Sequence, residues 1–248
     1  MIGNGGNGSH GRLIAAATAP YRAAGTLAWH FAQGKLRGDP VFAGLLEQEL
    51  IPRCDRLLDL GCGQGLLASW LLAARARHAA GDWPERWPAP PRIGQIEGIE
   101  LMPRDVARAR TALGANASFA AGDIRRADFG QAGAIVILDV LHYLTVPEQD
   151  DILERARNAL LPSGTLLLRI GDAGGGWGFR WSGWVDRAVM FARGHGRLTL
   201  HCRPLRDWVA ALDRLGFGVQ EMPMSRGTGF ANVLLVARVP ATPPLLLA

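Results

Sequence analysis

Residues 57–65 decide how this sequence folds: they read Leu-Leu-Asp-Leu-Gly-Cys-Gly-Gln-Gly. The apolar residues around Asp59 predict a buried strand, and the three glycines predict a turn. Residues 66–77, rich in alanine and leucine, predict a helix directly after that turn. A strand, a glycine turn and a helix in this order bring backbone N–H groups close to a ligand, because glycine has no Cβ to block the approach.

The spacing of the glycines separates two kinds of nucleotide-binding loop. A dinucleotide loop follows G-x-G-x-x-G, and its third glycine would stand where this chain has Leu66. The chain instead places Gly61, Gly63 and Gly65 at every second position after Asp59. This pattern resembles the first motif of class I S-adenosylmethionine-dependent methyltransferases. A tight turn without a ligand is the alternative, but three glycines at this period are hard to explain by packing.

Glu100 ends the next predicted strand, residues 95–101. An acid at this place can accept hydrogen bonds from both ribose hydroxyls of a nucleotide. Glu100 lies 41 residues after Asp59, and a Pro/Trp-rich insertion at residues 78–92 accounts for the extra length. Glu97, in the same strand, is a rival that points elsewhere if Glu100 faces the ligand.

Asp123 and Ile124 follow the short predicted strand 117–120. The resemblance implies that Asp123 binds the adenine amino group and that the N–H of Ile124 meets the ring. A turn acid that caps a helix is the alternative interpretation of Asp123.

Asp139 and His142 follow predicted strand 134–138, whose five apolar residues suit a strand buried on both faces. The resemblance places residues after this strand beside the sulfonium and the acceptor, which implies a catalytic role for both. His142 is the candidate general base, since an unperturbed histidine pKa of about 6.5 lies in the useful range. A histidine that packs to hold the loop is the alternative interpretation. Asp139 is also a candidate to orient the methionine end of the cofactor. The predicted cofactor-binding residues are Asp59, Gly61, Cys62, Gly63, Gly65, Glu100, Leu101, Asp123, Ile124 and Asp139.

The predicted fold is α/β. It is a Rossmann-like, doubly wound, mostly parallel seven-stranded sheet with a C-terminal antiparallel strand, preceded by an N-terminal helical lid. The last two strands are predicted at residues 217–222 and 232–239. The expected organisation is a disordered tail at 1–11, the lid at 12–52, a methyltransferase domain at 53–240 with an inserted acceptor cap at 171–203, and a loose tail at 241–248.

Candidate acceptor residues come from the lid and the cap, with plain packing as the alternative for the aromatic ones. They are Tyr21, Trp177, Phe179, Arg180, Trp181 and His195. Residues 21–40 resemble methyltransferases that accompany bacterial fatty-acid-like and aryl-polyene pigment assembly, which implies an aromatic or acyl acceptor, small or carrier-bound. The motif Asn/Asp-Pro-Pro-Tyr is typical of methyltransferases that act on exocyclic or amide nitrogens, and Pro-Cys is typical of cysteine-based methylation of cytosine. Neither motif follows strand 134–138, so methylation of DNA bases is disfavoured.

Composition restricts the other function classes. The net charge of +5 comes from 27 basic and 22 acidic residues, and Lys35 is the one lysine. The sequence has no basic cluster interleaved with aromatic residues, so a nucleic-acid partner is not expected. Three scattered cysteines and no signal-peptide pattern favour the cytoplasm, and no apolar run is long enough to span a membrane. The six histidines show no metal-ligand spacing.

Two other functions stay open beside the methyltransferase, which would use S-adenosyl-L-methionine and release S-adenosyl-L-homocysteine. One is an NAD(P)-dependent oxidoreductase, against which Leu66 counts. The other is a non-catalytic, cofactor-binding member of the same fold. The oligomeric state cannot be predicted from these patterns.

Overall fold

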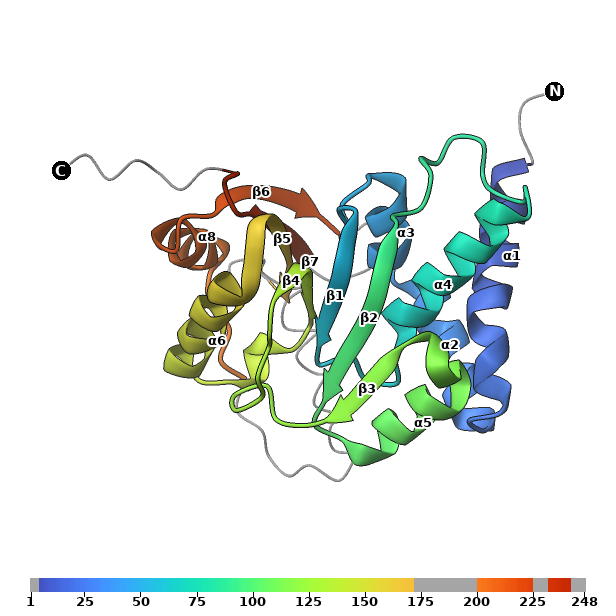
Figure 1. The fold of residues 1–248 in the computed structure, drawn as a ribbon, viewed down its shortest axis with the longest axis horizontal. Coiled ribbons are helices and arrows are strands. Elements are labelled where there is room, and N and C mark those ends of the chain that lie inside the picture. Colours follow the sequence, from blue (N-terminus) through green and yellow to red (C-terminus); the bar gives the residue numbers. More distant parts are fainter. Residues whose placement is uncertain (1–4, 172–199, 225–231, 242–248) are drawn as a thin grey trace. The chain divides into compact units, whose positions relative to one another are not determined.

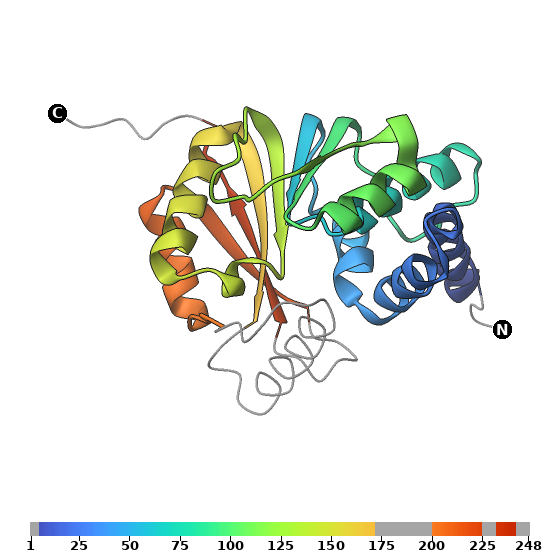
Figure 2. The ribbon, with the colours of Figure 1, turned by 90° about the horizontal axis from the view of Figure 1, so that it is seen from below.

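The computed structural model describes residues 5–171, 200–224 and 232–241. The chain divides into two compact units, Met1–Asp128 and Phe129–Ala248. Each unit combines strands with helices (Figures 1 and 2).

Three parallel strands form the sheet of the first unit: β1 (Cys54–Leu60), β2 (Ile93–Glu100) and β3 (Ser118–Ala121), in the order β3-β2-β1. Asp59 is in register with Gly98, and Glu100 is in register with Ala121. Because parallel strands end at the same edge, the segments after these three strands come together. These three strands lie close to their predicted positions.

Helical segments complete the described part of the first unit. They are α1 (Gly5–Thr18), η1 (Ala19–Arg22), α2 (Thr26–Gly38), α3 (Pro40–Glu47), α4 (Leu66–Ala79) and α5 (Pro103–Leu113), with a short turn η2 (Gly114–Asn116) after α5. Helix α1 lies along α4 (Figure 1). We call the segments from α1 to α3 the N-terminal layer.

Helix α1 begins at Gly5, inside the segment predicted to be a disordered tail. That boundary is corrected by contacts that the local composition does not reveal. Arg12 forms an ion pair with Asp82, 70 residues away, at 2.8 Å. The ring of His10 lies 5.5 Å from that of Trp87. Tertiary contacts therefore hold a Gly/Asn-rich helix start that has little intrinsic helix propensity.

The Pro/Trp-rich insertion between α4 and β2 holds itself together. Trp83 donates from Nε1 to the carbonyl oxygen of Pro88 at 2.9 Å, and its ring meets that of Trp87 edge-on at 5.6 Å. Asp82 also pairs with Arg77 of α4. These contacts indicate that Trp83 and Trp87 hold the insertion in its folded shape.

The second unit contains β4 (Ala132–Leu138), β5 (Leu160–Gly171), β6 (Gly218–Pro223) and β7 (Asn232–Arg238), in the order β4-β5-β7-β6. β4 and β5 are parallel, whereas β7 runs antiparallel to both of its neighbours. The helices in its described residues are η3 (Leu141–Tyr143), α6 (Val146–Ala159) and α8 (Leu205–Arg214). A capping box between Thr145 and Glu148 starts α6.

The seven strands of the described residues confirm the predicted fold class: a mostly parallel α/β arrangement that closes with an antiparallel C-terminal hairpin. Within the same residues, no helix combines the length and apolarity that crossing a bilayer requires.

Candidate active site

The loop between β1 and α4 is built on three glycines in left-handed conformations. Gly61, Gly63 and Gly65 have φ values of 78°, 54° and 78°, which residues with a Cβ rarely adopt. The N–H groups of Gly61 and Cys62 both donate to the carbonyl oxygen of Ile99, at 2.8 and 3.2 Å. The loop is therefore attached to the end of β2 before it enters α4.

Gly65 and Gly63 have different surroundings, which a Cβ added at each position reveals. A Cβ on Gly65 would stand 2.8 Å from Cζ of Phe119, so Gly65 lets α4 approach β3. A Cβ on Gly63 would meet no atom within 4 Å. The surface over Gly63 is thus open, as the approach of a ligand to the backbone requires.

Glu100 is fixed against this loop by both oxygens of its carboxylate. Oε2 accepts from the N–H of Gly63 at 2.9 Å, and Oε1 accepts from that of Met102 at 2.8 Å. A carboxylate accepts at about four positions, so each oxygen retains room for another donor. The rival Glu97 instead binds Arg56 at 2.6 Å. These contacts favour Glu100 for binding the ribose hydroxyls.

Asp59 and Cys62 are buried beside the loop, with 5% and 8% of their surfaces exposed. Burial, and to a smaller extent the nearby charge of Glu100, raises the pKa of Asp59 to about 7. Burial also raises the pKa of the Cys62 thiol, with the charges of Asp59 and Glu100 adding to the effect. The site therefore holds excess negative potential, which a cation would relieve.

Asp123 forms a local turn with Arg125. Its Oδ1 accepts from the N–H of Arg125 at 3.0 Å, and the guanidinium binds both carboxylate oxygens. The hydrogen bonds from the Arg125 side chain lower the pKa of Asp123. The adenine contact inferred for Asp123 stays a prediction, and it has to compete with Arg125.

The residues around Glu100 fit the nucleoside part of S-adenosylmethionine. Leu101 is 55% exposed directly after Glu100, whereas Ile124 is buried. The N–H of Gly122 donates to the carbonyl oxygen of Glu100 at 2.9 Å, which brings the turn that carries Asp123 to the same edge. An exposed leucine beside a fixed carboxylate offers an apolar surface to a base and acceptors to a ribose.

Asp139 is held in the second unit by an arginine that the sequence analysis missed. Arg169, on β5, donates from Nε to Oδ1 at 2.8 Å and pairs through Nη2 with Oδ2 at 2.7 Å. Arg169 is 4% exposed, and Asp139 adopts a left-handed φ of 59°. Because a buried guanidinium binds both of its carboxylate oxygens, Asp139 fixes the turn after β4. An arginine in the apolar run 165–170 is the sequence signal by which Arg169 could have been found.

His142 lies in η3, which two further residues hold in place. Gln149, fully buried on α6, directs its Nε2 at the carbonyl oxygens of Leu141, Leu144 and His201, at 3.0, 2.9 and 2.7 Å. Arg203 donates from Nε to Oε1 of Gln149 at 2.7 Å. The sequence analysis missed both residues. They position the turn that carries the candidate base.

The remaining candidates fall into two groups. Tyr21 is fully buried, and its hydroxyl donates to the carbonyl oxygen of Gln64 at 2.9 Å. The candidates from the predicted cap lie outside the described residues: Trp177, Phe179, Arg180, Trp181 and His195.

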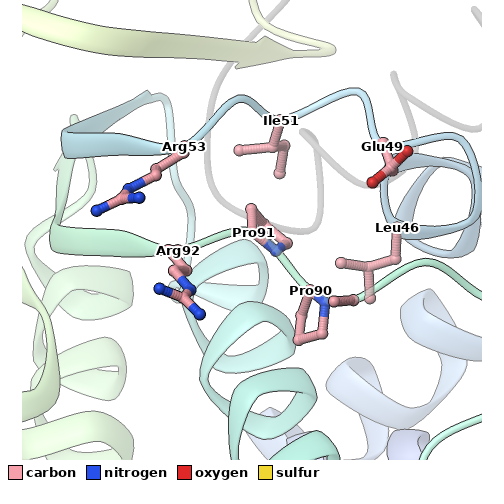
Figure 3. A pocket seen from close by; sticks show the side chains of 8 residues that line it. Leu46, Glu49, Ile51, Arg53, Pro90, Pro91 and Arg92 are labelled. Carbon is pink, nitrogen blue, oxygen red and sulfur yellow. The ribbon is translucent and has the colours of Figure 1, made fainter.

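A cavity of about 270 Å³ lies elsewhere in the first unit (Figure 3). Arg53 and Arg92, which border it, directly precede β1 and β2. The cavity is therefore at the amino ends of these strands, whereas the glycine loop is at their carboxyl ends. Within the described part of the chain, no three His, Cys, Asp or Glu side chains gather as a metal site.

Comparison with known proteins finds a family that matches part of the chain. Residues 57–164, from β1 into β5, match a family described as a methyltransferase domain. A carboxy-S-adenosyl-L-methionine synthase from Chromohalobacter salexigens is 32% identical over 130 residues, which are 50% of this chain and 43% of that protein. The match thus spans less than half the length of that relative.

Solved structures share the fold at low sequence identity. An O-methyltransferase family protein from Burkholderia thailandensis has a TM-score of 0.60 and 18% identity, over 90% of this chain and 63% of the other. Magnesium protoporphyrin IX methyltransferase from Synechocystis PCC 6803, solved with S-adenosylhomocysteine, has a TM-score of 0.57 and 16% identity, over 87% and 88% of the two chains.

Residues 57–164 therefore match the methyltransferase-domain family, and these comparisons support the resemblance to class I S-adenosylmethionine-dependent methyltransferases. The comparisons also support S-adenosylmethionine as the predicted cofactor. The oxidoreductase alternative is not favoured.

Proposed function

We propose that the protein transfers the methyl group of S-adenosylmethionine in line to a small or carrier-bound acceptor with an aromatic or acyl group. Bound S-adenosylmethionine supplies a methyl group already activated by positively charged sulfur. The chain then has to bind, orient and exclude water rather than provide strong chemical activation. The acceptor class is inferred from the resemblance of residues 21–40, and the cytoplasm is the proposed location because the cysteines are few and scattered.

The single observation that carries this proposal is the placement of Glu100. Its carboxylate is fixed to the N–H of Gly63 in the loop and retains free acceptor positions. In the proposed complex, Glu100 binds the ribose hydroxyls, the open surface of the loop over Gly63 faces the methionine end, and Asp59 balances the positive charge. Asp139 and Arg169 fix the turn after β4, and His142 takes a proton where the acceptor has one to lose.

Calorimetry with S-adenosylhomocysteine tests the cofactor part of the proposal. The wild type is expected to bind, and Glu100→Gln to bind about 10- to 100-fold more weakly, because a charge-assisted acceptor pair is lost. Glu97→Gln is the matched control, since Glu97 lies on the same strand but pairs with Arg56. Equal affinity for the wild type and Glu100→Gln would contradict the proposed site.

A second candidate function is chemistry on the cofactor itself. The 32% identity to a carboxy-S-adenosyl-L-methionine synthase favours this candidate. Mass spectrometry of the nucleoside product separates the two: methyl transfer releases S-adenosylhomocysteine and a methylated acceptor, whereas a synthase of that kind yields a heavier, still cationic nucleoside.

A further inference from the structure

Gln64 is the part of the glycine loop that faces the N-terminal layer. It stands between Gly63 and Gly65, and only 3% of its surface is exposed. Its carbonyl oxygen accepts from the hydroxyl of Tyr21 at 2.9 Å. Its side-chain Nε2 donates to the carbonyl oxygen of Ala28, on α2, at 2.9 Å. The N-terminal layer thus holds this residue by both its main chain and its side chain.

Tyr21 is suited to a permanent donor role. It lies in η1 with no exposed surface, and burial raises its pKa, so the hydroxyl keeps its proton at physiological pH. A buried tyrosine hydroxyl needs a partner, and the carbonyl oxygen of Gln64 supplies one.

The loop needs support from this side. Glycines lose more conformational entropy on ordering than other residues, so a loop with three of them is intrinsically mobile. The contacts with Ile99 and Glu100 hold the side of the loop that faces β2. Tyr21 and Gln64 hold the opposite side, between the two glycines that flank Gln64.

We propose that Tyr21 and Gln64 are positioning residues that hold the glycine loop in its cofactor-binding shape. Through them the N-terminal layer sets cofactor affinity without touching the cofactor. This inference rests on the proposed binding of S-adenosylmethionine at the loop. It replaces the expected contact of Tyr21 with the acceptor by a role in positioning the loop.

The test compares Tyr21→Phe with Trp70→Phe. Tyr21→Phe removes one oxygen and keeps the ring. Trp70, on α4, also makes a buried hydrogen bond to the N-terminal layer, from Nε1 to the carbonyl oxygen of Phe42 at 2.8 Å, but it does not contact Gln64 through that bond. By calorimetry, we expect Tyr21→Phe to weaken S-adenosylhomocysteine binding about five- to tenfold. Trp70→Phe should change it less than about twofold, although its stability loss is larger.

Hydrogen exchange without ligand supplies the second measurement. The amide of Gly65, which donates to the carbonyl oxygen of Cys62 at 2.9 Å, should exchange faster in Tyr21→Phe than in the wild type and in Trp70→Phe. Gln64→Glu, which lacks the Nε2 donor to Ala28, should show the same increase.

The outcomes are distinct. Unchanged affinity and unchanged Gly65 exchange in Tyr21→Phe would overturn the inference, as would equal losses of affinity in Tyr21→Phe and Trp70→Phe. If the wild type fails to bind S-adenosylhomocysteine while Gly65 exchange still rises in Tyr21→Phe, the proposed function fails and the support of the loop by Tyr21 stands.

Discussion

The surroundings of Asp59 disfavour the ionised form of its carboxyl group when no cation is bound. Its pKa is raised from 3.8 to about 7 by burial and by Glu100. The folded protein therefore keeps a proton that the unfolded chain loses near pH 4. The stability of the ligand-free protein should fall as pH rises from about 4 to about 7 and then level off.

Binding of the cationic cofactor should show the opposite trend. The ionised form of Asp59 attracts the positive charge, so S-adenosylmethionine affinity is expected to fall as pH drops below about 7, by up to about tenfold per pH unit. Calorimetry at pH 6, 7 and 8 measures this dependence. Asp59→Asn should flatten the profile, and a wild-type affinity that does not change with pH would contradict the assigned role of Asp59.

Single residues also mark the limit of the sequence analysis. Asp59 and Glu100 follow from an acid at the end of a strand, which is a local pattern. Arg169 could be seen as an unusual charge in an apolar strand, but its partner Asp139 is 30 residues away. Which buried charge pairs with which is fixed by strand register, and a single sequence does not show that register.

At the scale of elements, the loop between β1 and α4 contains one glycine that packing requires, Gly65, and one that we expect cofactor binding to require, Gly63. Gly65→Ala combines a φ of 78° with a Cβ 2.8 Å from Phe119, and it should lower the free energy of unfolding by about 2–4 kcal/mol. Gly63→Ala has a φ of 54° and no contact within 4 Å, so it should cost about 1 kcal/mol.

The same pair should behave differently in binding. The Cβ of Gly63→Ala would occupy the open surface that the cofactor approaches, so this variant should lose S-adenosylhomocysteine affinity while remaining the more stable of the two. Urea unfolding and calorimetry on both variants check this. Full affinity in Gly63→Ala would show that the cofactor does not approach the loop there.

The turn η3 depends on α6 through Gln149. Gln149→Leu removes the donor to three carbonyl oxygens and the acceptor for Arg203, all of them buried or half-buried. We expect the free energy of unfolding to fall by about 2–4 kcal/mol in urea denaturation. Gln220→Leu, at an exposed site on β6, is the control and should cost less than about 0.5 kcal/mol. Similar values for both variants would contradict the anchoring role of Gln149.

Element positions were largely predictable because strands and helices leave periodic patterns and glycine or proline boundaries. Helix α5 begins at Pro103 and ends at Leu113, as its proline start and its apolar spacing predict. Helix α1 was placed too late because Arg12 and His10 gain their partners from a segment about 70 residues further along the chain.

For the whole molecule, cofactor binding should appear as stabilisation against heat. A ligand at about 100 times its Kd adds about 2.7 kcal/mol, which for a chain of this length raises Tm by about 5–11 °C. S-adenosylhomocysteine is expected to give this shift in a thermal unfolding scan, and NADH to give none. The reverse result would favour the oxidoreductase over the methyltransferase.

More of the fold than of the function could be predicted from the sequence. Asp59, Glu100, Asp123 and Asp139 each lie at the carboxyl end of a strand or just after it. Their order along the chain predicted the class of fold. Neither the acceptor nor the role of Tyr21 follows from such an order. Both depend on side chains that converge from distant segments, which sequence spacing does not encode.

Because Cys62 is buried, the rate at which its thiol is alkylated measures how often the glycine loop opens. Its thiol has 8% of its surface exposed and a raised pKa, so alkylation by iodoacetamide has to wait for the loop to open. Cys202 is half-buried and supplies an internal reference within the same molecule. The ratio of the two labelling rates, read by peptide mass, therefore reports how often the loop opens, and S-adenosylhomocysteine should slow labelling at Cys62 alone.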